Sequence, residues 1–248
     1  SSSNIKHLNN AIISDFQAVF DEGRWLDQQV QRTKGNVLVY ISGHGVPDSE
    51  QNAYFVPIRT DPSYPAGLYP RSKVVAALER AKRYQAGRDR RVLALFDSCF
   101  SGDSSEGAVT PGKTGLPSQA IKSNLDEITI ISATQSKGIA YPDEDLGISA
   151  LTSGFLQGLA GLADAPSVGG DGNGQVSSVE LIDYIRRSVP LLSKRGQKPD
   201  MRSGEAFSFT PYAIEPLKPK LAVQDGARRW SKLSKAYDFG EDLRELGL

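Results

Sequence analysis

The segment Asn36-Val-Leu-Val-Tyr-Ile-Ser-Gly-His44-Gly45 decides how this sequence is expected to fold. Its apolar, largely β-branched run is typical of a strand buried on both faces, and a turn bounded by glycines follows directly. A second segment repeats the plan, because Arg91-Val-Leu-Ala-Leu-Phe96 leads into the turn Asp97-Ser-Cys99-Phe-Ser-Gly102. Glu127–Ser132 (EITIIS) predicts a third buried strand. Each of the first two strands therefore ends at a turn that carries one reactive side chain.

Helices are expected between and after these strands. Apolar side chains recur at helical spacing, and Ser177 stands three residues before Glu180 in the pattern of a capping box. The helices are predicted at Asn9–Phe20, Arg71–Ala86, Ile148–Ala163 and Leu181–Ser188. Strands that alternate with helices indicate an α/β fold with a mostly parallel central sheet, covered on both faces.

The remaining segments predict shorter strands, loops and a tail. Further pieces of strand are expected at Tyr54–Pro57 and Ala206–Phe209, and a tight loop at Gly169–Gly174. The stretch Ser101–Asn124 is rich in small and polar residues and predicts a long mobile loop. We expect one domain over residues 1–210 and a C-terminal tail over residues 211–248.

Composition excludes several classes of function. The chain has 248 residues, and 29 Lys and Arg balance 29 Asp and Glu, so no charge excess favours nucleic acid or a membrane surface as partner. No apolar run approaches the ~20 residues of a membrane span, and the first ten residues are polar, unlike a signal peptide. These features predict a cytoplasmic location. The single cysteine excludes an intrachain disulfide and metal sites built from several cysteines.

His44 and Cys99 are the candidate catalytic residues. The carboxyl ends of parallel strands meet at one edge of a sheet, so the two turns lie together if the two strands are neighbours. A cysteine attacks as its thiolate, and an imidazole can take the thiol proton and later protonate a leaving amine. Alone, Cys99 would be a buried structural thiol and His44 a turn residue bonded to backbone. The occurrence of both residues in matching turns favours a joint catalytic role for them.

The two motifs resemble those of caspases, metacaspases and bacterial caspase-like peptidases. His44 precedes Cys99 by the caspase spacing of about 50 residues. Ile131–Gln135 and Gly169–Ile185 resemble later segments of that family, so the resemblance covers roughly residues 3–210. It implies a three-layer α/β/α caspase-like fold and a cysteine endopeptidase that acts on protein or peptide substrates. The family's first strand normally precedes the segment that begins here near Ser3, so a missing N-terminal segment or a regulatory partner is expected to complete the fold.

The resemblance also implies roles for individual residues. Cys99 would attack the scissile carbonyl, His44 would act as acid and base, and the N–H groups of Gly45 and Cys99 would bind the oxyanion. Asp97 occupies the position that forms the floor of the specificity pocket, where a carboxylate selects substrates with arginine or lysine before the cut. Caspases are matured by a cut in the linker after the nucleophile, which predicts self-cleavage after Lys113 or Lys122.

Other interpretations of these residues remain open. In the alternative interpretation, Asp97 caps the turn after its strand. Asp143 and Asp145 lie in a loop that could face the same pocket, although loop aspartates are more often solvated. The whole chain could also be a catalytically silent scaffold that has kept the fold.

Two further motifs suggest ligands. Gly107–Thr114 matches the phosphate-binding pattern G-x-x-x-x-G-K-[ST], which makes a nucleotide hydrolase using Lys113 the alternative from another class. That chemistry needs a strand before the loop and a helix after it, and the flanking sequence offers neither. Asp171–Glu180 resembles the second half of a calcium loop, but the first ligand position falls on Gly169, which has no side-chain oxygen. We therefore expect no metal or cofactor, and leave open the calcium activation known from metacaspases.

Overall fold

The structure is a computed structural model in which a four-stranded sheet has the order β1-β5-β8-β12. It describes residues 4–33, 35–48, 52–84, 90–99, 103–104, 107–108, 128–134, 138–143, 145–202, 204 and 208–209. Strands β1 (Val37–Ser42), β5 (Val92–Asp97) and β8 (Ile128–Ser132) run parallel, and β12 (Asp200–Arg202) joins β8 antiparallel. The expected α/β class with a mostly parallel sheet is confirmed, and the three predicted strands form its parallel part.

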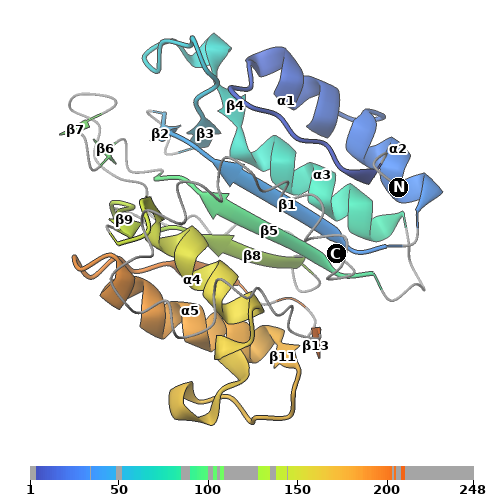
Figure 1. The fold of residues 1–248 in the computed structure, drawn as a ribbon. Coiled ribbons are helices and arrows are strands. Elements are labelled where there is room, and N and C mark those ends of the chain that lie inside the picture. The colour runs from blue at the N-terminus through green and yellow to red at the C-terminus, as the bar shows by residue number, and fades with distance from the viewer. Residues whose placement is uncertain are drawn as a thin grey trace.

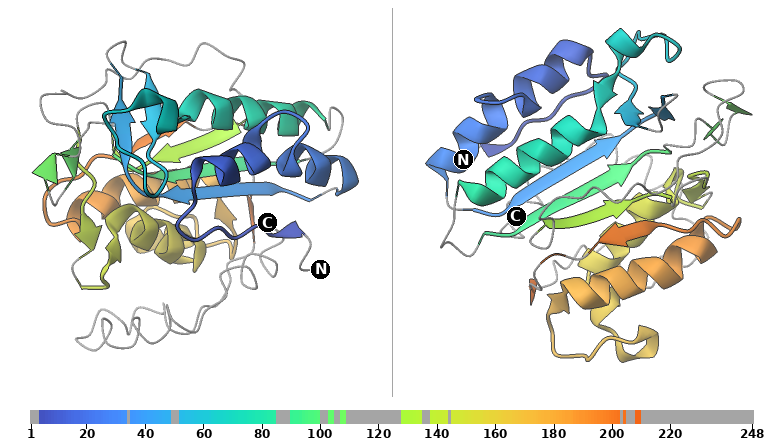
Figure 2. Two further views of the ribbon diagram at one scale, coloured as in Figure 1. Left: turned by 90° about the horizontal axis from the view of Figure 1, so that it is seen from above. Right: turned by 180° about the vertical axis from the view of Figure 1, so that it is seen from behind.

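Helices cover both faces of this sheet (Figures 1 and 2). One face carries α1 (Ile13–Phe20), α2 (Trp25–Arg32) and α3 (Arg71–Arg83), and the other carries α4 (Ala150–Leu159) and α5 (Ser178–Leu192). Within the described ranges, every helix is too short or too polar to cross a lipid bilayer.

The sequence of β5 is apolar without interruption because helices pack against both of its faces. Its side chains alternate between the faces, so Ala94 and Phe96 pack in the cluster under α1, α2 and α3, while Leu93 and Leu95 pack against α4 and α5. All six residues of the strand are buried. A strand with helices on both sides has no solvated face, and this burial holds it at the centre of the sheet.

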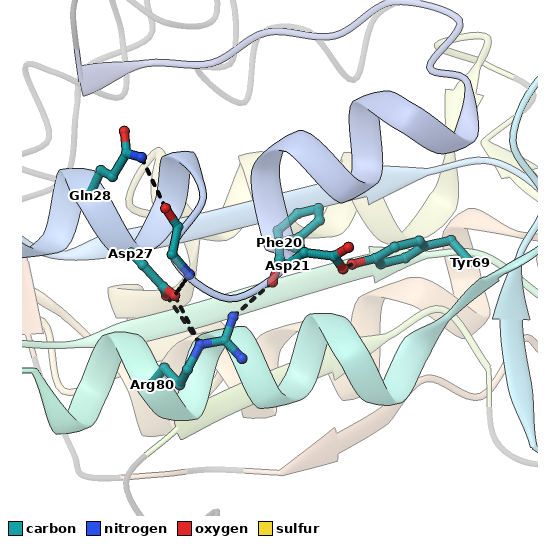
Figure 3. Close-up of polar contacts among 7 residues, drawn as sticks. Phe20, Asp21, Asp27, Gln28, Tyr69 and Arg80 are labelled. Atoms are coloured by element: carbon teal, nitrogen blue, oxygen red, sulfur yellow. Dashed lines mark hydrogen bonds and ion pairs between the residues drawn. The ribbon is translucent and has the colours of Figure 1, made fainter.

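A buried ion pair fastens α2 to α3 (Figure 3). Asp27 is 1% exposed, and its carboxylate accepts hydrogen bonds from Arg80 Nε at 3.0 Å and from the Gly23 N–H at 2.7 Å. The Arg80 guanidinium also donates to the Phe20 carbonyl oxygen at 2.8 Å. Helix α2 was not predicted from the sequence, because a charged residue on its buried face interrupts the apolar pattern.

The predicted helices differ from the observed ones mainly at their ends. The helix expected over Ile148–Ala163 ends at Leu159, because Gly161 adopts a left-handed conformation with φ 103° that continues no helix. Helix α5 is longer than the predicted segment. It begins within the capping box that the sequence indicated, in which the N-cap Ser177 and the third helical residue Glu180 bond each other's backbone.

Short strands lie around the central sheet. They form the three-stranded sheet β2-β3-β4 and the pairs β6-β7, β9-β10 and β11-β13. Their bounds are β2 Gly45–Pro47, β3 Ala53–Phe55, β4 Tyr69–Pro70, β6 Asp103–Ser104, β7 Gly107–Ala108, β9 Pro142–Asp143, β10 Ile148–Ser149, β11 Val176–Ser177 and β13 Ser208–Phe209. The strand predicted at Ala206–Phe209 is seen over its last two residues, and the predicted tail lies outside the described residues.

Candidate active site

The turns that carry His44 and Cys99 leave neighbouring strands at the same edge of the sheet. Strands β1 and β5 are parallel partners whose last paired residues are Ser42 and Asp97. His44 stands two residues beyond Ser42, and Cys99 two residues beyond Asp97. The condition on which the sequence argument depended, that the two strands are neighbours, is therefore met, and the two motifs stand at matching positions (Figure 1).

Gly43 fastens the histidine turn to the end of β5. Its N–H donates to the Asp97 carbonyl oxygen at 3.2 Å, and its φ of 155° is one that residues with side chains rarely adopt. His44 follows with an exposed side chain, while its carbonyl oxygen accepts the Val56 N–H at 3.0 Å. The turn thus presents the imidazole to solvent while its backbone is bonded on both sides.

The Gly45 N–H points away from its strand partner. In the pair β2-β3 the Val56 N–H donates to His44 and the Asp48 N–H donates to Asn52. In an antiparallel ladder, the backbone N–H and carbonyl groups of every second residue point toward the partner strand. The backbone groups of His44 and Asp48 point toward β3, so those of Gly45, the residue after His44, point to the other side. This orientation suits the oxyanion role that the resemblance implies for Gly45.

Cys99 is 9% exposed, and a backbone amide lies against its sulfur. The Ala140 N–H donates to Sγ with an N–S distance of 2.8 Å. A hydrogen-bond donor at this position stabilises negative charge on sulfur and so favours the thiolate form of the side chain. Ala140 was not singled out in the sequence, because a backbone donor leaves no trace in residue type.

Gln197 holds the segment that contains Ala140. This side chain is 3% exposed, and its Oε1 accepts the Tyr141 N–H at 2.7 Å while its Nε2 donates to the Ala133 carbonyl oxygen at 2.9 Å. Sequence reasoning missed Gln197 as well, since it lies in a polar stretch with no motif around it.

Asp97 is 6% exposed and is bonded to hydroxyl groups of helix α4. Ser149 Oγ donates to Oδ1 at 2.7 Å, the Thr152 hydroxyl donates to Oδ2, and the Tyr40 hydroxyl lies beside them, 3.0 Å from Thr152 Oγ1. Burial raises the pKa of the Asp97 carboxyl, and the three hydroxyl groups oppose that shift. Asp97 therefore binds the start of α4, and most of the turn after its strand lies outside the described residues.

No cation is paired with Asp97 among the residues that the structure describes. All of its partners are neutral hydroxyl groups, so its charge, when present, is solvated by dipoles alone. Tyr40 is 49% exposed, and burial of its hydroxyl end, followed by the charge of Asp97, raises the pKa of its phenol. Within the described part of the chain, the arrangement leaves a buried carboxylate without a counter-ion beside the strand end that leads to Cys99.

Asp143 and Asp145 have structural partners of their own. Asp143 is buried, contrary to the expected solvation, and accepts the N–H groups of Asp145 and Leu146 and the Ser153 hydroxyl. Asp145 is exposed and pairs with Lys194 at 3.0 Å. Neither carboxylate contacts Asp97.

Three acidic side chains, one from the predicted loop Gly169–Gly174 and one from each side of it, lie close together. Carboxylate oxygens of Asp164, Asp171 and Glu180 lie within 4.8 Å of one another, so Asp164 supplies an oxygen that Gly169 lacks. All three already accept backbone N–H groups of that loop, such as that of Gly174 on Asp164 at 3.0 Å and that of Asp171 on Glu180 at 2.9 Å. These bonds account for the acidic cluster as the framework of the loop.

Other residues singled out in the sequence lie outside the described residues. They are Gly102, Lys113, Lys122 and the phosphate-binding pattern beyond its first two residues. Those two, Gly107 and Ala108, form strand β7 paired with β6.

Comparison with known proteins adds no relative, since neither a protein-family model nor a curated protein matches the sequence.

Proposed function

We propose that this chain is a cysteine endopeptidase with a three-layer α/β/α caspase-like fold, in which Cys99 is the nucleophile and His44 its acid–base partner. The observation that carries the proposal is the register of β1 and β5, which ends at Ser42 and Asp97. An imidazole and a thiol each stand two residues beyond that pair, at the edge of a parallel sheet where catalytic sites assemble.

The proposed reaction has two steps. His44 takes the proton of the Cys99 thiol, and the thiolate attacks the carbonyl carbon of the scissile peptide bond. The N–H groups of Gly45 and Cys99 stabilise the oxyanion that forms. The carbon–nitrogen bond then breaks as the imidazolium protonates the leaving amine, and water attacks the thioester to release the acid and restore the thiol.

Asp97 is proposed to select arginine or lysine before the scissile bond. Its support is the buried carboxylate beside the nucleophile's strand end, surrounded by neutral hydroxyl groups. A substrate guanidinium or ammonium would supply the counter-charge, whereas a substrate aspartate would bring a second negative charge into the same place.

The test is cleavage of fluorogenic peptides with basic residues by purified wild type and by Cys99→Ala. We expect wild type to cleave and Cys99→Ala, checked for an unchanged thermal unfolding midpoint, to be inactive. A folded Cys99→Ala protein that cleaves as well as wild type would remove Cys99 as nucleophile. Absence of cleavage by wild type on a full peptide library would instead favour the catalytically silent scaffold.

A further inference from the structure

The amide that lies against Cys99 belongs to a segment without regular secondary structure. Ala140 N is 2.8 Å from Sγ, and the residue precedes the two-residue strand β9. A thiolate benefits from an N–H donor far more than a neutral thiol does, because sulfur in a thiol is only a weak acceptor. The share of reactive thiolate should therefore depend on how closely this segment is held.

One buried side chain helps to hold it, beside the Ala150 N–H, which donates to the Tyr141 carbonyl oxygen at 3.0 Å. The Tyr141 N–H, one peptide unit after that of Ala140, donates to Gln197 Oε1 at 2.7 Å. The other end of the same amide donates from Nε2 to the Ala133 carbonyl oxygen at 2.9 Å. The Gln197 backbone is itself fixed, since its N–H donates to Ser193 Oγ at 3.1 Å.

The Gln197 side chain connects the segment that contains Ala140 to β5, the strand that leads to Cys99. Ala133 follows β8, and its N–H donates to the Phe96 carbonyl oxygen at 2.9 Å. Phe96 precedes Asp97 at the end of β5, three residues before Cys99. A single amide side chain thus spans from the sheet beside the nucleophile to the segment that supplies the donor, and both of its polar atoms are used.

We propose that Gln197 is a positioning residue for Cys99: it holds the Ala140 N–H against Sγ and so increases the thiolate share of the nucleophile. The proposal rests on the proposed function only in naming Cys99 as nucleophile. The effect on the thiol itself can be measured without a peptide substrate.

The experiment is alkylation of the full chain with iodoacetamide. Cys99 is the single cysteine, so the alkylation rate reports on this thiol alone. At mildly acidic pH the rate follows the thiolate fraction, whereas at alkaline pH it follows access to the sulfur. We expect Gln197→Leu to slow alkylation about tenfold at mildly acidic pH, the size of one hydrogen bond to an ionised group, with little change at alkaline pH.

Gln157→Leu is the matched control. This glutamine also makes two side-chain hydrogen bonds, to Ser153 at 3.0 Å and to Tyr184 at 2.9 Å, within the pair of helices α4 and α5. We expect it to lower the unfolding midpoint while leaving the ratio of the acidic and alkaline alkylation rates unchanged. A folded Gln197→Leu protein with the wild-type ratio would overturn the proposal.

A second pair of variants covers the case in which Gln197→Leu does not fold. Ala140→Pro removes the N–H, and Ala140→Gly keeps it. The ratio should fall in the proline variant and stay in the glycine variant; equal ratios in the two would overturn the proposal. If wild type cleaves no peptide but the ratio falls as expected, the proposed function fails while the role of Gln197 stands.

Discussion

Asp97 and Ser149 are joined by a hydrogen bond of 2.7 Å from the serine hydroxyl to carboxylate Oδ1. The same serine oxygen accepts hydrogen bonds from the N–H groups of Leu151 and Thr152. Ser149 is therefore both the N-cap of α4 and a hydrogen-bond donor to Asp97. A carboxylate near the first turn of a helix is favoured by the helix dipole. Asp97 therefore contributes to the fold as well as to the candidate site.

Stability should depend on pH through Asp97. Burial raises the pKa of its carboxyl above the ordinary value of 3.8, so the folded state binds this proton more tightly than the unfolded chain. The resulting stabilisation is complete below 3.8 and is lost as the pH rises through the raised pKa. Asp97→Asn lacks this titration. We expect wild type to gain stability relative to Asp97→Asn as the pH falls through that window.

The measurement is the free energy of unfolding of both proteins in urea at a series of pH values. Tyr40, the other titratable group at the carboxylate, has a raised pKa above 10 and does not titrate in this window. A difference between the two proteins that is constant with pH, or that changes in the opposite direction, would contradict the assignment.

Substrate preference should depend on the charge of Asp97. We expect wild type to prefer peptides with Arg or Lys before the cut over peptides with Asp. The expected preference is several hundredfold, from the ~3–5 kcal/mol cost of an unpaired buried charge. Asp97→Ala should lose this preference, as shown by kcat/KM for peptides ending in Arg, Lys, Asp and Ala. Asp143→Ala is the control, because it removes another buried aspartate that contacts Ser153 and turn amides and should keep the preference.

Self-processing is expected in the segment after the nucleophile. Active enzyme should produce new termini after Lys113 or Lys122, detected by mass spectrometry of the intact and the cleaved chain. Cys99→Ala should stay intact under the same conditions. Wild type that remains uncut while it cleaves basic peptides would show that this linker is not a substrate.

The Asp27–Arg80 pair should contribute much more to stability than the more exposed pair of Asp21, at the end of α1, with Lys73 on α3. Arg80→Met leaves the Asp27 carboxylate buried without a cation and should cost about 3–5 kcal/mol of unfolding free energy. Lys73 is 51% exposed, and Lys73→Met should cost less than about 1 kcal/mol. Urea unfolding of the two variants provides the comparison, and equal losses would refute the distinction.

The sequence was sufficient for the parts of the fold whose burial leaves a pattern. Strands β5 and β8 have apolar runs because both of their faces are covered, and the start of α5 has a capping box whose two partners are three residues apart. Strand β1 was expected to be buried on both faces as well, but one of its faces exposes Tyr40 and Ser42. The proximity of the turns after β1 and β5 followed from one condition, that parallel neighbours end at one edge. Such features depend on local chemistry and are visible in a single sequence.

The missed features depend on contacts between distant segments. Gln197 acts through the backbone of Tyr141 and Ala133, so no residue type at either partner position indicates it. Helix α2 was missed because Asp27 occupies its buried face, and only the position of Arg80 on another helix explains that charge. Two of the hydroxyl partners of Asp97, Ser149 and Thr152, likewise come from the start of α4, which the chain reaches more than fifty residues later.

The alternation of side chains along β5 has a consequence for how this protein can evolve. The two apolar clusters lie on opposite faces and share no side chain, so each can exchange its residues without requiring compensation in the other. The freedom ends where the strand ends: Phe96 belongs to the cluster under α1, α2 and α3, while Asp97 is bonded to α4. These two successive residues thus connect both apolar clusters to the turn that holds Cys99. We therefore expect substitutions at Phe96 and Asp97 to be selected against more strongly than substitutions elsewhere in either cluster.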